Sequence, residues 1–334
     1  MSKKILKLLC LAAGGGVLVF VAGQLDIQEV MTRSLQIGWG MGVILALYFL
    51  AFLADAFSWQ MTLPCIPLNK LWLYRIWKVR LVGEALNNVI PAAGLGGEPV
   101  KAMLLKRRYA IGYSEGITSL ILIQAIILIS LLFFISVGFI LALYSDKISN
   151  RSDAIAVVGL LVIGLGVATV VLLPHANLSS RIGRLAARIG IGERLEVALR
   201  HVGDIEKRLV DFYTSRRRRF VGALVMAVTP WIIGVLEIYY TSLFLGHPVS
   251  FAEAWIIESS VQMVRAAVPF IPGGLGVQEG VFVALLTAIT GSPVLGGAIA
   301  MVRRFREIVW LAGGGVAGLS FLFASRAPQA ELRD

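Results

Sequence analysis

Long runs of apolar residues, almost free of charged residues, dominate the sequence. A membrane-spanning helix needs ~20 such residues to cross ~30 Å of hydrocarbon. The runs therefore predict membrane-spanning helices at roughly residues 5–23, 38–58, 117–143, 154–174, 220–245 and 307–324. Two further apolar stretches, roughly 71–95 and 251–291, are interrupted by proline, glycine and charged residues.

The composition also indicates a membrane protein. Hydrophobic residues make up 57% of the 334 residues and charged residues only 15%, whereas soluble domains carry ~25% charged residues. A water-soluble protein of this size could not bury so much apolar surface. We therefore expect one all-α, polytopic membrane domain over residues 1–334, made of a first half (1–174), a basic loop (175–219) and a second half (220–325), with no soluble catalytic domain.

The positive charge is unevenly distributed along the chain. The net charge is +11, and residues 175–219 hold eleven Lys/Arg against five acids. Apolar spacing in this loop predicts an amphipathic helix that binds anionic headgroups on the cytoplasmic face. Cytoplasmic loops of membrane proteins commonly carry an excess of Lys and Arg, which explains the charge of this loop more simply than nucleic-acid binding does. No nucleic-acid partner is therefore expected. A second basic zone at 70–108 and balanced loops at 24–35 and 145–153 place the N-terminus in the cytoplasm.

The two interrupted stretches resemble each other. The motif at 87–100 and the motif at 269–281 each contain proline, then Gly-Leu-Gly, then glutamate, then an apolar run. A glycine-rich break cannot face lipid, because its freed N–H and C=O groups would lack partners. By the loop charges, the two breaks are reached from opposite faces of the membrane. They predict two broken, re-entrant hairpins in a possible inverted repeat, with a site near the membrane midplane.

These motifs resemble the flippase-like membrane-domain family, which also forms the transmembrane half of lysylphosphatidylglycerol synthases. The resemblance covers nearly the whole chain, and the second half is most similar to the hopanoid-associated branch through Trp231, Glu237, residues 245–250, Glu253, Ala254, Glu258, Gln262, Arg265, residues 272–280 and residues 303–307. Many relatives carry an acid–arginine pair early in the helix after the first motif, where residues 119–125 are uncharged here.

The resemblance implies translocation of a polar-headed lipid between the leaflets of a bacterial inner membrane. The lipid would be an anionic or zwitterionic phospholipid, a hopanoid or a polyprenyl-linked lipid. The candidate substrate-binding residues are Asn87, Asn88, Gly96, Gly97, Glu98, Glu258, Arg265, Gly274, Gly276, Gln278, Glu279 and Arg304.

Glu98 and Glu279 each follow a glycine-rich turn, in the first turn of an expected helix. The helix dipole stabilises an acid there by ~0.3–1 kcal/mol, which is a sufficient structural reason for either residue. An ionisable group at membrane depth is nevertheless costly and indicates function. Both interpretations stay open: a structural helix end, or a site for a proton, a cation or an amine headgroup.

Arginine is the natural phosphate ligand because its guanidinium binds phosphate oxygens in pairs. Arg265 lies seven residues after Glu258, so both side chains can face one cavity. Arg303, Arg304 and Arg306 could equally be basic residues at a membrane boundary.

Three other polar residues carry structural expectations. Asn87 and Asn88 are expected to hold the broken backbone rather than a headgroup. We expect Asp55 to pair with a base such as Arg75 or Lys78, and Glu237 to be solvated or paired with arginine.

Other chemistry finds little support in the sequence. The three histidines lie far apart, which argues against a metal site, and no phosphate-binding Gly-x-x-x-x-Gly-Lys-Ser/Thr loop occurs. We therefore expect a transporter that needs no cofactor and that can form a homo-oligomer. Two alternatives remain: an integral membrane enzyme that modifies lipid headgroups, and a non-transporting anchor for a lipid-modifying complex.

Overall fold

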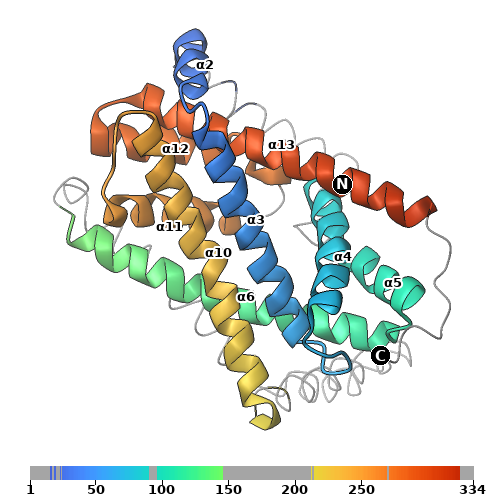
Figure 1. The fold of residues 1–334 in the computed structure, drawn as a ribbon. Coiled ribbons are helices and arrows are strands. Elements are labelled where there is room, and N and C mark those ends of the chain that lie inside the picture. The colour runs from blue at the N-terminus through green and yellow to red at the C-terminus, as the bar shows by residue number, and fades with distance from the viewer. Residues whose placement is uncertain are drawn as a thin grey trace, which may run out of the picture.

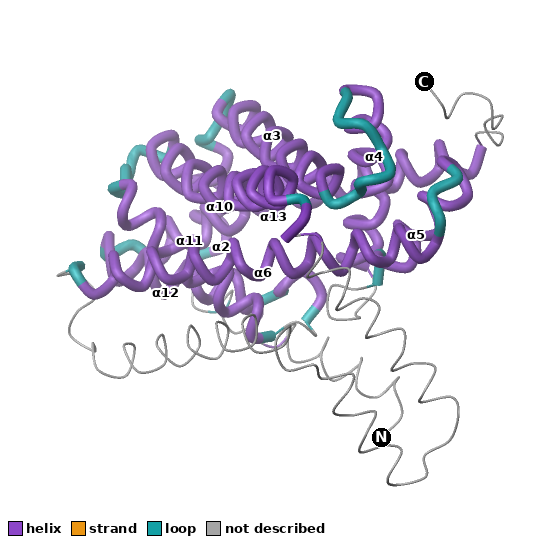
Figure 2. Tube along the Cα trace, turned by 90° about the horizontal axis from the view of Figure 1, so that it is seen from below, coloured by secondary structure: helices purple, strands orange, loops and turns teal. Residues whose placement is uncertain are grey.

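The computed structural model describes residues 25–89, 96–145, 214–268 and 271–323, together with Gly16, Val19, Gly23 and Phe212. Within these residues the chain forms helices joined by short loops, and no strand occurs (Figure 2). The expected span at 154–174 lies outside the described residues, as do nearly all of the span at 5–23 and of the basic loop at 175–219.

Three described helices are long and apolar enough to cross a membrane. They are α3 (Gly40–Met61), α6 (Tyr113–Leu143) and α10 (Arg217–Phe244), which confirms the spans predicted at 38–58, 117–143 and 220–245. The span predicted at 307–324 is instead the second half of a longer helix, α13 (Pro293–Phe323). This helix continues through a charged stretch because those charges are paired inside the protein.

Each interrupted stretch begins with a capped helix that leads to a glycine-rich break. The first contains α4 (Lys70–Val89) and α5 (Glu98–Tyr109), and the second contains α11 (Phe251–Ala267), a 3-10 turn η2 (Pro272–Gly274) and α12 (Val277–Thr290). Asn69 accepts from the backbone N–H of Trp72 at the start of α4, and Ser250 forms a capping box with Glu253 before α11. These polar caps satisfy backbone donors that would otherwise lack partners.

The described helices form two units with the same order, α3–α6 and α10–α13. Helices α6 and α13 are both 31 residues long, so position 113 corresponds to 293 and position 143 to 323. The correspondence extends to packing: Gly116 of α6 contacts Ala102 of α5, and Gly296 of α13 contacts Phe282 of α12. The same local joint is therefore built twice.

The two units pack through an antiparallel pair, α3 and α10, at the centre of the molecule (Figure 1). Gly40 at the start of α3 meets Phe244 at the end of α10, and the Ser58 hydroxyl near the other end donates to the carbonyl of Ala223 (2.7 Å). Across this pair, α4 packs on α13 while α11 packs on α6. The second helix of each unit therefore packs on the last helix of the other unit. An inverted repeat would produce this arrangement.

Two separate apolar cores lie in this arrangement. One surrounds Trp59 and Ile76, and the other surrounds Phe134 and Phe282. A short helix, α2 (Ile27–Leu35), is capped by Asp26 and packs on α13. The polar site lies between the cores, along the α3–α10 pair.

The contact between the backbones of Gly83 and Gly97 generates a stability prediction. A Cβ atom on Gly97 would lie 2.0 Å from the carbonyl oxygen of Gly83, so Gly97→Ala must force α4 and α5 apart. We expect a loss of about 1–3 kcal/mol in the free energy of unfolding, measured in detergent. Gly42→Ala in α3 is the control, because nothing lies within 4 Å of its added Cβ; equal stability of both variants would contradict the prediction.

Candidate functional site

A cavity of about 390 Å³ lies between α3, α4, α6, α10, α11 and α13. Its walls carry an unusual density of charge for a membrane protein. The carboxylates are Asp55, Glu84, Glu237, Glu258 and Glu307, and the arginines are Arg80, Arg265, Arg303 and Arg306. Charges inside a membrane domain are costly unless paired, and they commonly mark a pathway for a polar substrate.

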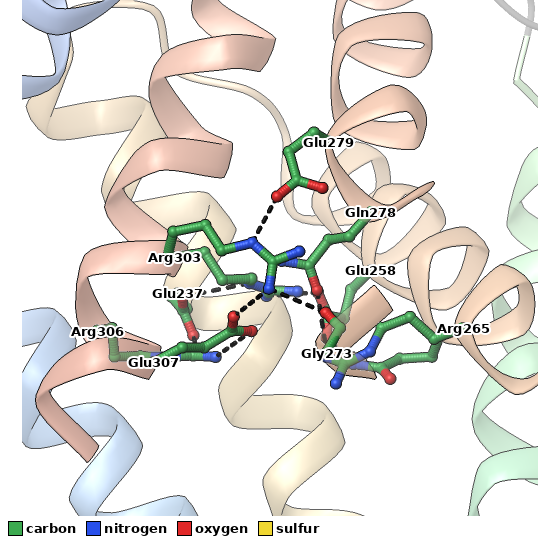
Figure 3. A network of polar contacts seen from close by, with 11 residues as sticks. Glu237, Glu258, Arg265, Gly273, Gln278, Glu279, Arg303, Arg306 and Glu307 are labelled. Atoms are coloured by element: carbon green, nitrogen blue, oxygen red, sulfur yellow. Dashed lines mark hydrogen bonds and ion pairs between the residues drawn. The ribbon is translucent and has the colours of Figure 1, made fainter. Parts of the chain in front are cut away.

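Arg303 is the centre of one ion-pair network in the cavity wall (Figure 3). Its Nη2 donates to Glu258 Oε2 (2.6 Å) and its Nε to Glu237 Oε1 (3.4 Å), while Arg306 pairs with the other oxygen of Glu237. Gln262 donates to the second oxygen of Glu258 (2.7 Å). The Arg303 and Glu258 side chains are each only 2% exposed. These contacts tie α10, α11 and α13 together.

A second network holds the break between α11 and α12. Arg304 of α13 donates to Glu279 (2.5 Å), to the carbonyl oxygen of Gly273 (2.9 Å) and to Glu307 (2.6 Å). The break itself needs glycine, since φ is +59° at Gly273, +60° at Gly274 and +79° at Gly276. Arg304 thus satisfies a carbonyl that the break frees from helical hydrogen bonding.

Arg265 differs from the other three arginines that line the cavity. Its Nη1 donates to the neutral Oε1 of Gln278 (3.2 Å), and no ion pair joins it to a carboxylate within the described ranges. Arg80, Arg303 and Arg306 each pair with an acid. Arg265 and Glu258 both line the cavity, as their spacing of two helical turns predicts.

The first break is held differently, and those of its residues that the structure describes do not line the cavity. Glu98 Oε1 accepts from Lys101 Nζ (2.6 Å) and more weakly from Asn87 and Gln124 (3.5 and 3.4 Å). The Asn87 side-chain oxygen accepts from the backbone N–H of Gly97 (2.6 Å). Asn87 therefore holds the broken backbone.

The residues predicted to bind substrate thus lie in three places rather than in one site. Glu258 and Arg265 line the cavity, while Gly274, Gly276, Gln278, Glu279 and Arg304 form the second break behind it. Asn87, Gly96, Gly97 and Glu98 form the first break. The side chain of Asn88 lies outside the described residues.

Gln124 occupies the position in the first unit that Arg304 occupies in the second. Each lies at the twelfth position of a 31-residue helix, and each donates to the glutamate after its own break. The uncharged stretch at 119–125 is therefore a real difference between the halves. The glutamate after the second break is tied to α13 by an ion pair, whereas the glutamate after the first break contacts α6 through a neutral amide.

The description of the family whose model matches the chain is the transmembrane region of lysylphosphatidylglycerol synthase, and the match covers residues 5–314. The chain belongs to this family. It is thus an integral membrane protein with a function connected with membrane lipids.

Two archaeal relatives resemble the chain along most of its length. A UPF0104 membrane protein of Methanothermobacter thermautotrophicus is 21% identical over 322 residues, 92% of each chain. A second, from Pyrococcus horikoshii, is 26% identical over 273 residues, 77% of this chain and 79% of the relative. No solved structure matches the chain.

The structure corrects two expectations for this family member. Asp55 pairs with Arg80 (2.5 Å) rather than Arg75 or Lys78, because Arg75 lies over the ring of Trp72 and Lys78 over the ring of Tyr74.

Arg303 and Arg306 are also not exposed basic residues, since both side chains are buried and paired with glutamates. The sequence analysis left them, Glu237, Glu307 and Glu84 out of the site. For Arg303, Arg306 and Glu307, one feature of the sequence could have indicated a shared site: their spacing places the three charges on one helical face.

The buried network predicts a large effect on stability. Arg303→Met leaves Glu258 buried without its cation, and we expect a loss of about 3–5 kcal/mol in the free energy of unfolding in detergent. Arg33→Met is the control, because Arg33 pairs at 3.8 Å with a half-exposed Glu29 and should cost below about 1 kcal/mol. Similar small losses for both variants would show that the network contributes nothing to stability.

Proposed function

We propose that the protein translocates a polar-headed lipid between the two leaflets, with the headgroup in the charged cavity. The observation that carries this proposal is Arg265, a cavity arginine whose described partner is a neutral amide. A guanidinium of this kind can bind a phosphate without first breaking an ion pair. The family's description, which names a lipid synthase, supports a lipid as the substrate.

The cavity chemistry favours an anionic or zwitterionic headgroup. Its arginines suit a phosphate, and its carboxylates would accept hydrogen bonds from an amine or hydroxyl group. A phospholipid, a hopanoid or a polyprenyl-linked lipid with such a headgroup would leave its apolar tail in the bilayer. The headgroup would then cross the membrane without meeting hydrocarbon, which is the main barrier to spontaneous flipping.

The paired units supply a means of movement. In this mechanism the α3–α10 pair is the axis, and the two units rock about it to open the cavity to one leaflet and then the other. Glu98 and Glu279 each have one buried carboxylate oxygen without a hydrogen-bond partner in the described part of the chain. These oxygens are the proposed sites of protonation in the transport cycle.

The proposed location is the cytoplasmic membrane of a bacterium, with the N-terminus inside. The basic zones at 70–108 and 175–219 support this orientation. The 175–219 loop would lie against anionic headgroups on that face.

Arg265→Gln should slow lipid translocation in proteoliposomes about tenfold or more, because a charged hydrogen bond to phosphate contributes ~1.5–3 kcal/mol. Labelled phospholipid, polyprenyl phosphate and hopanoid would be compared, and Arg265→Lys should retain part of the rate. Arg107→Gln is the control, since it removes an exposed arginine that does not line the cavity.

An unchanged rate in a folded Arg265→Gln protein would contradict the role of Arg265. Absence of movement for every lipid in the wild type would contradict translocation itself. A change in lipid mass on incubation would instead indicate a headgroup-modifying enzyme.

The two break glutamates predict a dependence on protons. An imposed proton gradient should change the translocation rate of the wild type, because protonation of either carboxyl removes its ion pair. The double variant Glu98→Gln/Glu279→Gln should show the same rate with and without the gradient. A gradient effect that survives in this variant would assign the coupling to another acid.

A further inference from the structure

The first half of α4 carries one face of mixed apolar and basic side chains. Leu71, Tyr74, Arg75 and Lys78 are spaced three and four residues apart, so they lie on the same side of the helix. Leu71 is 52% exposed and Tyr74 is 55% exposed, while the two basic side chains are half-buried. None of the four residues lines the charged cavity. We call these four residues the basic face of α4.

Aromatic rings hold the two cations of the basic face. The guanidinium of Arg75 lies 4.9 Å from the ring centre of Trp72 and 5.5 Å from that of Tyr109. The Lys78 ammonium lies 5.3 Å from the ring centre of Phe321, near the end of α13. A ring attracts a cation through its π face, without accepting a conventional hydrogen bond. The rings therefore position both cations while their N–H donors stay available to another group.

The two cations have no acidic partner in the described part of the chain. Neither Arg75 nor Lys78 forms a side-chain hydrogen bond or an ion pair with another described residue, and the first acid of α4 is Glu84. The last turn of α5, residues 106–108, adds three basic residues, and this helix lies with α4 and the end of α13 on one side of the molecule (Figure 1). The described residues therefore leave positive charge on the basic face without a counter-charge.

This mixture of side chains fits the zone where lipid headgroups meet acyl chains. A surface covered by hydrocarbon alone would not carry two cations without partners, because charge is costly there. A surface covered by water alone would gain nothing from an exposed leucine and tyrosine. At the headgroup level both kinds of side chain are favourable, and basic clusters there attract anionic lipids.

We propose that the basic face of α4 binds an anionic phospholipid. Its phosphate accepts hydrogen bonds from Arg75 and Lys78, and an acyl chain lies against Leu71 and Tyr74. Arginine suits this role because its guanidinium can bind two phosphate oxygens at once. The site is separate from the charged cavity, so this lipid is a resident ligand and not the translocated one. The inference does not depend on translocation.

The test compares phosphatidic acid with phosphatidylcholine of the same acyl chains, which share the phosphate and differ in net charge. Native mass spectrometry of the detergent-purified protein measures the retention of each lipid, and the wild type should prefer phosphatidic acid. Arg75→Gln and Lys78→Gln should each lower this preference about fivefold, because a basic residue near an anionic lipid surface contributes ~1 kcal/mol. The double variant should retain both lipids nearly equally, whereas Lys78→Arg should keep the preference because it keeps the charge.

Lys106→Gln is the matched control, because it removes one exposed cation from α5, outside the basic face; it should keep the wild-type preference. An equal loss in this variant would overturn the inference, since the preference would then follow from the overall charge of the surface. Equal retention of both lipids by the wild type would also overturn it, as would a preference that survives in the folded double variant. Displacement of the lipid by an equal concentration of inorganic phosphate would do the same, because the acyl chain would then contribute nothing.

Discussion

A polar group inside this protein is costly unless it finds a partner within the protein, because hydrocarbon supplies none. This constraint explains why the chain places its charges on facing helices. Glu237 and Glu258 could not be buried unless Arg303 and Arg306 reached them from α13. The same constraint acts on the breaks, where Asn87 and Arg304 bond to backbone groups that no helix satisfies.

Buried ion pairs are weak evidence for stability, since well-packed apolar residues are often as stabilising. A membrane bundle could have been built more simply with leucine at these positions. The charge on the cavity walls therefore supports the proposed polar-headed substrate. Within this network Arg265 is the exception, because its neutral partner Gln278 leaves a cation available at the cavity surface.

The sequence predicted the features that depend on local pattern. Apolar run length gave α3, α6 and α10, and the glycine-rich motifs gave the two breaks. The ion-pair partners could not be predicted, because pairing depends on which helix faces meet, and the apolar pattern does not give those faces. Asp55 lies on the face of α3 that meets Arg80, and nothing in the spacing of basic residues on α4 indicates that face. Arg303 looked like a boundary residue for the same reason.

The two units can be compared at residues 119–125, where the chain lacks the acid–arginine pair that many relatives carry. Arg304 of α13 forms an ion pair with the glutamate after the second break, whereas Gln124 of α6 donates a weak hydrogen bond of 3.4 Å to the glutamate after the first. Halves of equal architecture but unequal bonding do not move equally. Among the described residues, the polar tie from the long helix to the break glutamate is thus weaker in the first unit, so in the proposed rocking motion this tie would break more readily on the side of Glu98.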